Sequence, residues 1–256
     1  MSHTDLILLA TAAVYPLLLA VEHLAPARWQ PALPAWRTIG ALFFVAFSAV
    51  SFYLPLALPP AWFEASLLPG ASLGLAGGTV LGYLAVSLVG YAWHRAAHAS
   101  PLLWRLFHQA HHAPKRLDVS SAAIFHPTEM VFYTLMPLAV TTLVLGLDPL
   151  AAGFVGLIST FNAVFQHANI ATPRWLTWIM QRPEAHSIHH AEHAHNYGDF
   201  PLWDRLFGTY REGVGFRPEA GFAAEASRRW WAMAFFRDVN APAAPGRTGV
   251  VARVRA

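Results

Sequence analysis

Residues 93–112 read WHRAAHASPLLWRLFHQAHH, and this stretch decides how the rest of the chain is organised. It holds an HxxxH motif that begins at His94 and, after a gap of nine residues, an HxxHH motif that begins at His108. On a helix, positions i, i+3 and i+4 project from one face, so each motif presents its imidazoles as a cluster. A second HxxHH motif at residues 186–190 repeats the spacing. Three such motifs indicate a metal site rather than scattered surface histidines.

The composition indicates an integral membrane protein. Of the 256 residues, 55% are hydrophobic and 12% are charged, whereas soluble domains carry about a quarter charged residues. The chain has no cysteine, which excludes disulfides and thiolate metal ligands. A metal bound here is therefore held by nitrogen or oxygen.

Five apolar runs predict the membrane spans. The first is expected to be a retained span and not a secretion signal, because its leader MSHTD has no lysine or arginine. The last is short and could form a re-entrant hairpin. The runs cover residues 6–21, 39–58, 79–92, 127–147 and 150–165. We expect an all-α integral membrane protein with about four to five transmembrane helices, a helical histidine-rich cap that holds two metals, and a loop with a short interfacial piece at residues 61–78.

Alternation of the spans places every histidine motif on one side of the membrane. The third run ends in the first motif, the fourth begins beside His126, and the fifth ends beside His167. With five spans and the amino terminus outside, all seventeen lysines and arginines fall on this histidine side, whereas the other side holds Asp5, Glu64 and Asp148. The positive-inside rule then predicts that the histidine cap is cytoplasmic.

The part of the chain after the last run is less apolar. From Pro173 on, aromatic residues alternate with basic ones, for example Trp178 and Arg182, as expected for helices that lie at the membrane interface. The tail from Ala241 is expected to be disordered. We divide the chain into three parts. They are an amino-terminal transmembrane hairpin and loop (1–78), a catalytic domain (79–212), and an interfacial helix with a basic tail (213–256).

Neutral imidazole is a good ligand for iron, zinc, copper and nickel. The motifs supply eight imidazoles, which are too many for one four-coordinate zinc and fit two metals with open positions. Carboxylates or carbonyls usually orient such ligands. The candidate carboxylates are Glu129, Glu184, Glu192, Asp199 and Asp204. Each could instead cap a helix or pair with an arginine, and for Asp204 we expect a pair with Arg205 or Arg211.

Other classes of protein also carry histidines in membranes. A metal transporter would place its ligands near the middle of the bilayer, whereas these motifs lie at the ends of spans. A membrane cytochrome would need single histidines on facing helices to hold haem. A zinc hydrolase would want fewer histidines and a nearby catalytic glutamate, and the sequence has no HExxH motif.

The motifs together resemble those of the fatty acid hydroxylase/sterol desaturase superfamily, whose members are integral membrane non-haem diiron oxygenases. Further matches are FHPTE at residues 125–129, QHAN at 166–169 and NYGDFPLWDRLFGT at 196–209. The resemblance covers roughly residues 80–212. It implies two irons, dioxygen as co-substrate, and oxidation of an unactivated C–H bond of a lipid such as a fatty acyl chain or a sterol. It favours hydroxylation, with desaturation at the same site as the alternative.

Carried over residue by residue, the resemblance makes the eight motif histidines iron ligands and adds one more. The implied ligands, which are also the catalytic residues, are His94, His98, His108, His111, His112, His167, His186, His189 and His190. The residues that could orient a ligand are His126, Glu129, Asn169, His193 and Asp204. Of these, His126 could also be a weak ligand. His3 and His23 are expected at the surface.

The electron source is expected to be a separate protein, because the sequence has no glycine-rich dinucleotide fingerprint and no cytochrome b5 module. A ferredoxin, or a cytochrome b5-like protein with its reductase, could dock on the basic surface of the cap. The lipid substrate is expected within the bilayer, and no nucleic acid is expected as a partner. Sixteen arginines against one lysine is a bias common in GC-rich bacterial genomes, which points to a bacterial inner membrane.

Overall fold

Every regular element in the described part of the chain is a helix, which confirms the all-α fold class. The computed structural model describes residues 1–30 and 32–240, so the tail from Ala241, predicted to be disordered, lies outside the described residues. In chain order, with η marking 3₁₀- and π-helices, the elements are α1 (His3–Leu24), α2 (Trp36–Leu56), η1 (Pro60–Phe63), η2 (Gly70–Leu73), α3 (Gly74–Ala99), α4 (Pro101–Leu103), η3 (Trp104–His108), η4 (Val119–Ser121), α5 (Pro127–Leu138), η5 (Ala139–Val144), α6 (Pro149–Phe165), η6 (Arg174–Trp178), α7 (Pro183–Glu192), α8 (Pro201–Leu206), α9 (Ala224–Ser227) and α10 (Trp230–Ala234).

Four helical segments of the described chain are long and apolar enough to cross a membrane. They are α1 with 22 residues, α2 with 21, η2 continued by α3 with 30, and α5 continued by η5 with 18. The apolar α6 has 17 residues and is shorter. These five helices agree with the prediction of four to five spans. The third span begins before the predicted residue 79, because the glycine-rich segment expected to be a loop continues the helix back to Gly74.

Local sequence signals explain where several spans begin. Ser2 caps α1 and forms a capping box with Asp5. Asp148 accepts hydrogen bonds from two amides in the first turn of α6, and Pro149 takes the first helical position, where no amide is needed. Pro137 lies inside α5 and removes one backbone donor, and the span continues after it as the π-helix η5.

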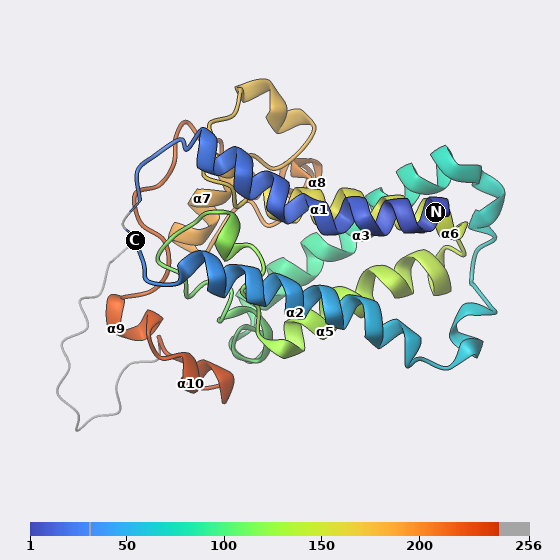
Figure 1. Cartoon of the computed structure of the whole chain (residues 1–256), viewed down its shortest axis with the longest axis horizontal. Helices are drawn as coiled ribbons and strands as arrows, with labels where there is room; N and C mark the ends of the chain where they lie inside the picture. Colours follow the sequence, from blue (N-terminus) through green and yellow to red (C-terminus); the bar gives the residue numbers. More distant parts are fainter. Residues whose placement is uncertain (31, 241–256) are drawn as a thin grey trace.

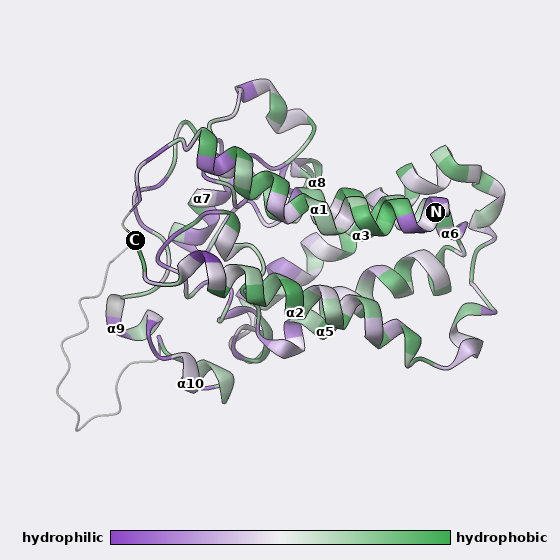
Figure 2. Cartoon of the chain, viewed as in Figure 1, coloured by the Kyte–Doolittle hydropathy of each residue, from purple (hydrophilic) through white to green (hydrophobic). Residues whose placement is uncertain are grey.

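The long helices form a bundle with an apolar outer surface. Helices α1 and α3 both pack on α6, and α2 packs on α5 (Figure 1). Hydrophobic residues run along these helices, whereas hydrophilic residues concentrate at the end that carries α7 (Figure 2). Outward-facing side chains such as Leu17, Leu42 and Val45 are each more than 60% exposed. An exposed apolar surface of this extent is one that lipid chains cover, so the protein is a multi-pass membrane protein.

The two ends of the bundle carry different parts of the chain. One end holds α7, α9, α10 and the connection between α1 and α2, and we call it the cap end (Figure 1). The opposite end holds the amino terminus, η1 and η2 (Figure 1). There the amides of Leu67 and Gly70 donate to the carbonyls of Leu143 and Leu145, which fastens residues 61–73 to the segment before α6.

A buried glutamate in α1 fastens the cap to the bundle. One carboxylate oxygen of Glu22 accepts hydrogen bonds from the amides of Val119, at 2.9 Å, and Asn169, at 2.7 Å. The Trp36 indole at the start of α2 donates to both carboxylate oxygens of Asp118, at 2.9 and 3.0 Å. Helices α1 and α2 therefore hold two segments in place. One contains Asp118 and Val119 and leads into the fourth span, and the other contains Asn169 and follows α6.

Helix α2 packs directly on the backbone of η4. A Cβ atom built on Gly40 would lie 2.3 Å from the carbonyl oxygen of Ser120 and 2.7 Å from its Cα. Such a distance is impossible for a real side chain, so only glycine allows this approach.

The residues after α6 follow the predicted pattern of interfacial aromatic and basic residues only in part. Trp175, Trp178 and Trp231 are 60%, 69% and 80% exposed at the cap end, as expected for interfacial aromatic residues. Arg182, however, is buried, and its guanidinium donates to Glu212 at 2.7 Å. Arg182 is therefore not an exposed interfacial residue, because its guanidinium is taken up by acceptors of Thr172, Glu212 and Gly213.

Candidate metal centre

Four segments of the chain bring the nine predicted ligands together at the cap end. The last turns of α3 carry His94 and His98, and the end of η3 with the turn that follows carries the second motif. His167 lies just after α6, and helix α7 carries the third motif. Pro183 at the first position of α7 starts this short helix without losing a backbone hydrogen bond.

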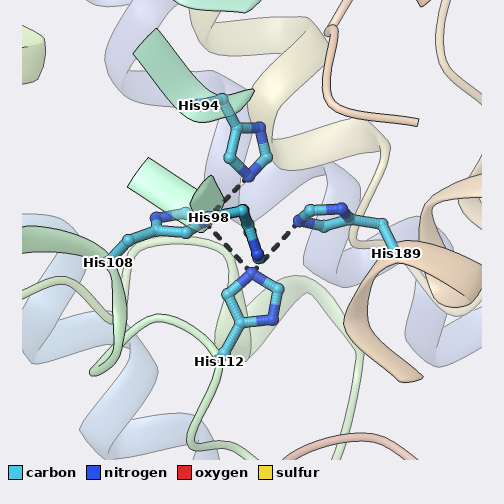
Figure 3. Close-up of side chains that lie close together, drawn as sticks. All are labelled: His94, His98, His108, His112 and His189. Carbon is cyan, nitrogen blue, oxygen red and sulfur yellow. Dashed lines mark hydrogen bonds between the residues drawn. The ribbon is translucent and has the colours of Figure 1, made fainter. Parts of the chain in front are cut away.

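The nine histidines form two groups, in each of which the facing atoms lie within 4.8 Å of one another. Group one consists of His94, His98, His108, His112 and His189. Group two consists of His111, His167, His186 and His190. In group one the rings come from three segments and point nitrogens toward a common space (Figure 3). Histidine is the only residue type in either group.

The two groups divide each HxxHH motif between them. His108 and His112 belong to group one, whereas His111 belongs to group two. In α7, His189 belongs to group one and its neighbour His190 to group two. The expectation that each motif acts as one cluster is therefore wrong. Positions i, i+3 and i+4 span about 100° around a helix, which is wide enough to face two neighbouring centres.

Backbone carbonyls fix three of the rings. The Nδ1 atom of His94 donates to the carbonyl of Tyr197 at 2.6 Å, and that of His189 donates to the carbonyl of His195 at 2.9 Å. The Nδ1 atom of His167 donates to the carbonyl of Ala163 at 2.7 Å. A neutral ring that donates through Nδ1 has a bare lone pair on Nε2, the form in which imidazole binds a metal.

Glu129 orients a fourth ring. Its Oε1 atom lies 2.6 Å from Nδ1 of His108, and its side chain is fully buried at the start of α5. The sequence proposed this carboxylate among five candidates, and it is the one that contacts a predicted ligand. Such a contact sets the direction of the ring and increases the basicity of the nitrogen that faces the metal.

The contacts between Nε2 atoms cannot all be hydrogen bonds. In group one, Nε2 of His108 lies 2.8 Å from that of His94 and 3.1 Å from that of His112. An imidazole nitrogen carries either one hydrogen or one lone pair in the ring plane, so it cannot satisfy two such neighbours. In group two, Nε2 of His190 likewise faces those of His167 and His186, at 3.2 and 3.1 Å. A cation at the centre of each group would satisfy all these lone pairs.

The surroundings keep these rings neutral. Burial lowers the pKa of His108, His111 and His112 well below the ordinary value, and the neighbouring imidazoles lower it further. The same two causes act on all three histidines of α7. Burial lowers the pKa of His167 to about 4, against the opposing effect of its hydrogen bond to Ala163. At neutral pH the rings are therefore ready to bind a metal without first losing a proton.

Two predicted orienting histidines lie outside both groups. His126 caps α5, where its Nδ1 accepts from the amide of Thr128, and its ring packs on Phe236. His193 ends α7 in the left-handed conformation, and its ring centroid lies 4.9 Å from that of His112. His126 therefore caps a helix, whereas His193 packs on a predicted ligand.

Asp204 acts through the backbone and not through an arginine. Its carboxylate accepts from the amides of Tyr197 and Gly198, at 2.9 and 2.7 Å, and from the hydroxyl of Thr209 at 2.7 Å. The expected ion pair is wrong, since Arg205 stacks over the ring of Trp178 and Arg211 pairs with Glu192. Because Tyr197 supplies the carbonyl that accepts from His94, Asp204 holds a predicted ligand in place indirectly.

The remaining candidates are structural. The side-chain amide of Asn169 donates to the carbonyl of Arg28 and not to a predicted ligand. Glu184 accepts from Thr172, and Glu192 pairs with arginines. Asp199 accepts a hydrogen bond from the side chain of Gln166 at 2.6 Å.

Sequence reasoning missed the groups that hold the rings from behind. The carbonyls of residues 163, 195 and 197 leave no sequence signal, because every residue type has a carbonyl. Glu22, which fastens the cap to the bundle, was also missed, although its position in the sequence was informative. A carboxylate near the end of an apolar span costs free energy to bury, so its presence indicates a role.

Comparisons with known proteins agree with the geometry. The model of a family described as fatty acid hydroxylase matches residues 79–209, about half of the chain. Sphinganine C4-monooxygenase 1 of Arabidopsis thaliana is 29% identical over 150 residues, which are 55% of this chain and 56% of that protein. A cholesterol 25-hydroxylase-like protein of Danio rerio is 26% identical over 129 residues, 46% of this chain and 49% of that protein.

A third relative is named for a different reaction. A probable Delta(7)-sterol 5(6)-desaturase of Neurospora crassa is 32% identical over 130 residues, which are 49% of this chain and 36% of that protein. The chain therefore spans about half the length, or less, of these relatives. No solved structure matches the chain at a significant level.

Proposed function

The chain belongs to the fatty acid hydroxylase family, and from this premise we propose that it is an oxygenase that uses dioxygen to hydroxylate an unactivated C–H bond of a membrane lipid. The observation that carries the proposal is the pair of histidine groups, in which nine imidazoles face two adjoining centres. The relatives support it, because two are named as a monooxygenase and a hydroxylase-like protein of lipids.

The residues fit two irons. Each group offers at least four imidazole nitrogens, held neutral by burial and, in four rings, oriented from behind by a carbonyl or by Glu129. Nitrogen-only sites of this kind accept iron as well as zinc or copper, and the family resemblance favours iron. When bound, the two irons would supply the activation of dioxygen that C–H oxidation needs.

The chain itself contributes orientation and the exclusion of water. His108 and His189 are no more than 2% exposed, so bulk water does not reach group one through them. Glu129 and the carbonyl of Tyr197 hold two neighbouring rings of group one, His108 and His94. Such a fixed and largely buried site favours oxidation of a positioned lipid over side reactions with water.

The membrane setting extends the proposal. We propose that residues 79–212 form the catalytic domain, and that the cap end faces the cytoplasm of a bacterium, with the spans in its inner membrane. A separate ferredoxin, or a cytochrome b5-like protein with its reductase, would supply electrons. The basic residues of the cap support docking of an acidic donor, because opposite charges steer the encounter.

Labelled dioxygen tests the reaction. Lipids from cells that express the chain under ¹⁸O₂ should contain a product heavier by one labelled oxygen atom, absent from cells that express His108→Ala. The desaturase relative makes desaturation the second candidate. A product that is two hydrogens lighter and unlabelled would establish desaturation instead, and no change in any lipid would contradict both reactions.

A further inference from the structure

Two adjoining cavities lie against α3 and α6 in the membrane part of the bundle. Their volumes are about 460 and 350 Å³, and they share Tyr83, Ile158 and Ile179 as lining residues. We call the two together the α3/α6 groove. Residues at its rim are open to the surroundings, since Trp178 is 69% exposed and Val80 is 61% exposed. Because this rim belongs to the apolar outer surface, lipid chains can enter the groove from the bilayer.

The groove contains one polar pair among apolar walls. The side-chain amide of Asn162 donates to the Tyr83 hydroxyl at 2.6 Å, and Asn162 is only 4% exposed. Its Oδ1 atom is buried and has no hydrogen-bond partner in the described chain. Leaving such an acceptor without a partner costs about 1–3 kcal/mol, so the site is built for something that donates to it.

The pair offers two complementary hydrogen-bonding groups. Asn162 Oδ1 can accept a hydrogen bond, and the Tyr83 hydroxyl, which already accepts from Asn162, can still donate its own hydrogen. A hydroxyl group both donates and accepts through one oxygen and so matches both. A carboxylate only accepts, and a hydrocarbon or an ether cannot donate.

The pair is also close to the metal centre along the chain. Gln166 follows Asn162 by one helical turn and is the last, capping residue of α6, and His167 of group two comes next. The Oε1 atom of Gln166 is also buried without a partner. Beside the polar pair, the ring centroid of Phe200 lies 5.8 Å from that of Tyr83. The polar pair therefore lies between the bilayer and group two.

We propose that the α3/α6 groove binds the hydroxyl end of a long-chain lipid alcohol, with the hydroxyl donating to Asn162 and accepting from Tyr83. Carbon atoms near that hydroxyl then lie toward group two. This assignment of substrate class rests on the proposed function, but binding to the groove can be measured without turnover.

Photo-crosslinking of the purified full-length chain tests the assignment. The probes are a diazirine-bearing hexadecanol, its methyl ether and the corresponding fatty acid, and labelled peptides are identified by mass spectrometry. We expect the alcohol to label residues 79–84, 157–162 and 178–180 about tenfold more strongly than either other probe. The reason is that the ether and the acid each lose one or two of the hydrogen bonds that the alcohol makes. Asn162→Leu should lower alcohol labelling to the level of the ether, and Tyr83→Phe should lower it several-fold.

Thr134→Val is the matched control. It removes a buried hydroxyl that contacts Ser51 at 3.1 Å in another part of the bundle, so alcohol labelling of the groove should be unchanged. Equal labelling by all three probes, stronger labelling by the acid, or unchanged labelling of both groove variants would overturn the assignment.

Iron content is measured on the same samples. Selective labelling of a chain that takes up no iron would contradict the proposed function alone, whereas iron-dependent lipid oxidation without selective labelling would contradict the groove alone.

Discussion

Single residues in the metal centre have unequal importance, because the two groups differ in the number of rings. Group one has five imidazoles and group two has four. Removal of His98 leaves four rings in group one, and its Nε2 has no hydrogen-bond partner to lose. Removal of His167 leaves three rings in group two, and the Nε2 atoms of those three rings each lose one contact.

We therefore predict different metal contents for two alanine variants. After reconstitution with iron, His98→Ala should keep about two irons per chain, whereas His167→Ala should keep about one, since four imidazoles still complete a site and three leave it weak. Plasma mass spectrometry against protein concentration measures both. Equal loss in the two variants would contradict the division into groups. One zinc that persists after reconstitution, with no iron uptake, would contradict the diiron assignment itself.

Asp199 gives a prediction about pH. Burial raises the pKa of its carboxyl from 3.8 to about 6, despite the hydrogen bond from Gln166. The folded chain therefore holds this proton at pH values where the unfolded chain has lost it, and stability falls as the pH rises from about 4 to about 6. The Asp199→Asn variant has no carboxyl at this position, so its stability lacks this pH-dependent contribution. The thermal midpoint of the wild type minus that of the variant should decrease across this range and stay level above it, and a constant difference would contradict the assignment.

The sequence predicted the members of the centre but not their partition. Clustered histidines are visible as letters, and so is Glu129, the carboxylate that contacts His108. The partition depends on how each motif is packed against the two centres. The third motif is divided within the regular helix α7, whereas the second begins at the end of a π-helix and finishes in a turn. Wider helical turns of this kind follow from packing rather than from local propensity, so periodicity does not reveal them.

At the scale of elements, the length of the apolar runs predicted the long helices correctly, whereas the glycines suggested a loop where the structure has a helix. The five apolar runs correspond to the five long helices. Gly74, Gly77 and Gly78 suggested a loop, yet they lie in the first turns of α3. A Cβ on Gly78 would lie 3.1 Å from the side chain of Ala151, so glycine here allows α3 to approach α6. Packing between helices thus overrides the low helix propensity of glycine.

The contact between α2 and η4 gives a prediction with a matched control. Gly40→Ala should destabilise the protein by about 1–3 kcal/mol, because the added methyl group meets the backbone of Ser120 and α2 must move away. At Gly156 in α6 an added Cβ meets nothing within 4 Å. Gly156→Ala should therefore be neutral or slightly stabilising. Thermal unfolding in detergent compares the two, and equal midpoints would contradict the close packing.

At the scale of the whole molecule, charge is distributed unevenly between the two ends. Arg28 and Arg37 lie in or next to the connection between α1 and α2 at the cap end, whereas Asp5, Glu64 and Asp148 lie toward the opposite end. This asymmetry supports a cytoplasmic cap.

Reporter tags test that orientation. A tag inserted after Pro114 or at the carboxyl terminus should report the cytoplasm, because α10, the last described helix, lies at the cap end and the histidine motif before Pro114 does too. A tag near residue 70 or at the amino terminus should report the opposite side. A cytoplasmic signal near residue 70 would mean that the number of spans, or their direction, differs from the one we propose.

The backbone carbonyls behind the ligands affect how this protein can diverge in evolution. Residues 163, 195 and 197 each hold a ligand ring through a main-chain oxygen. A substitution there replaces the side chain and leaves the acceptor in place, so residues 163 and 195 can change in evolution while the tautomer of each predicted ligand stays the same. The side chain of Tyr197 is more constrained, because its ring also packs on His94, His98 and His189. What selection must preserve is the path of the backbone, and His195 and Asn196 already adopt the left-handed conformation. Glycine is therefore the replacement that such a lineage would tolerate most readily at position 195. At position 196 it would remove the buried side-chain amide that bonds the backbone of Ala185 and Arg211.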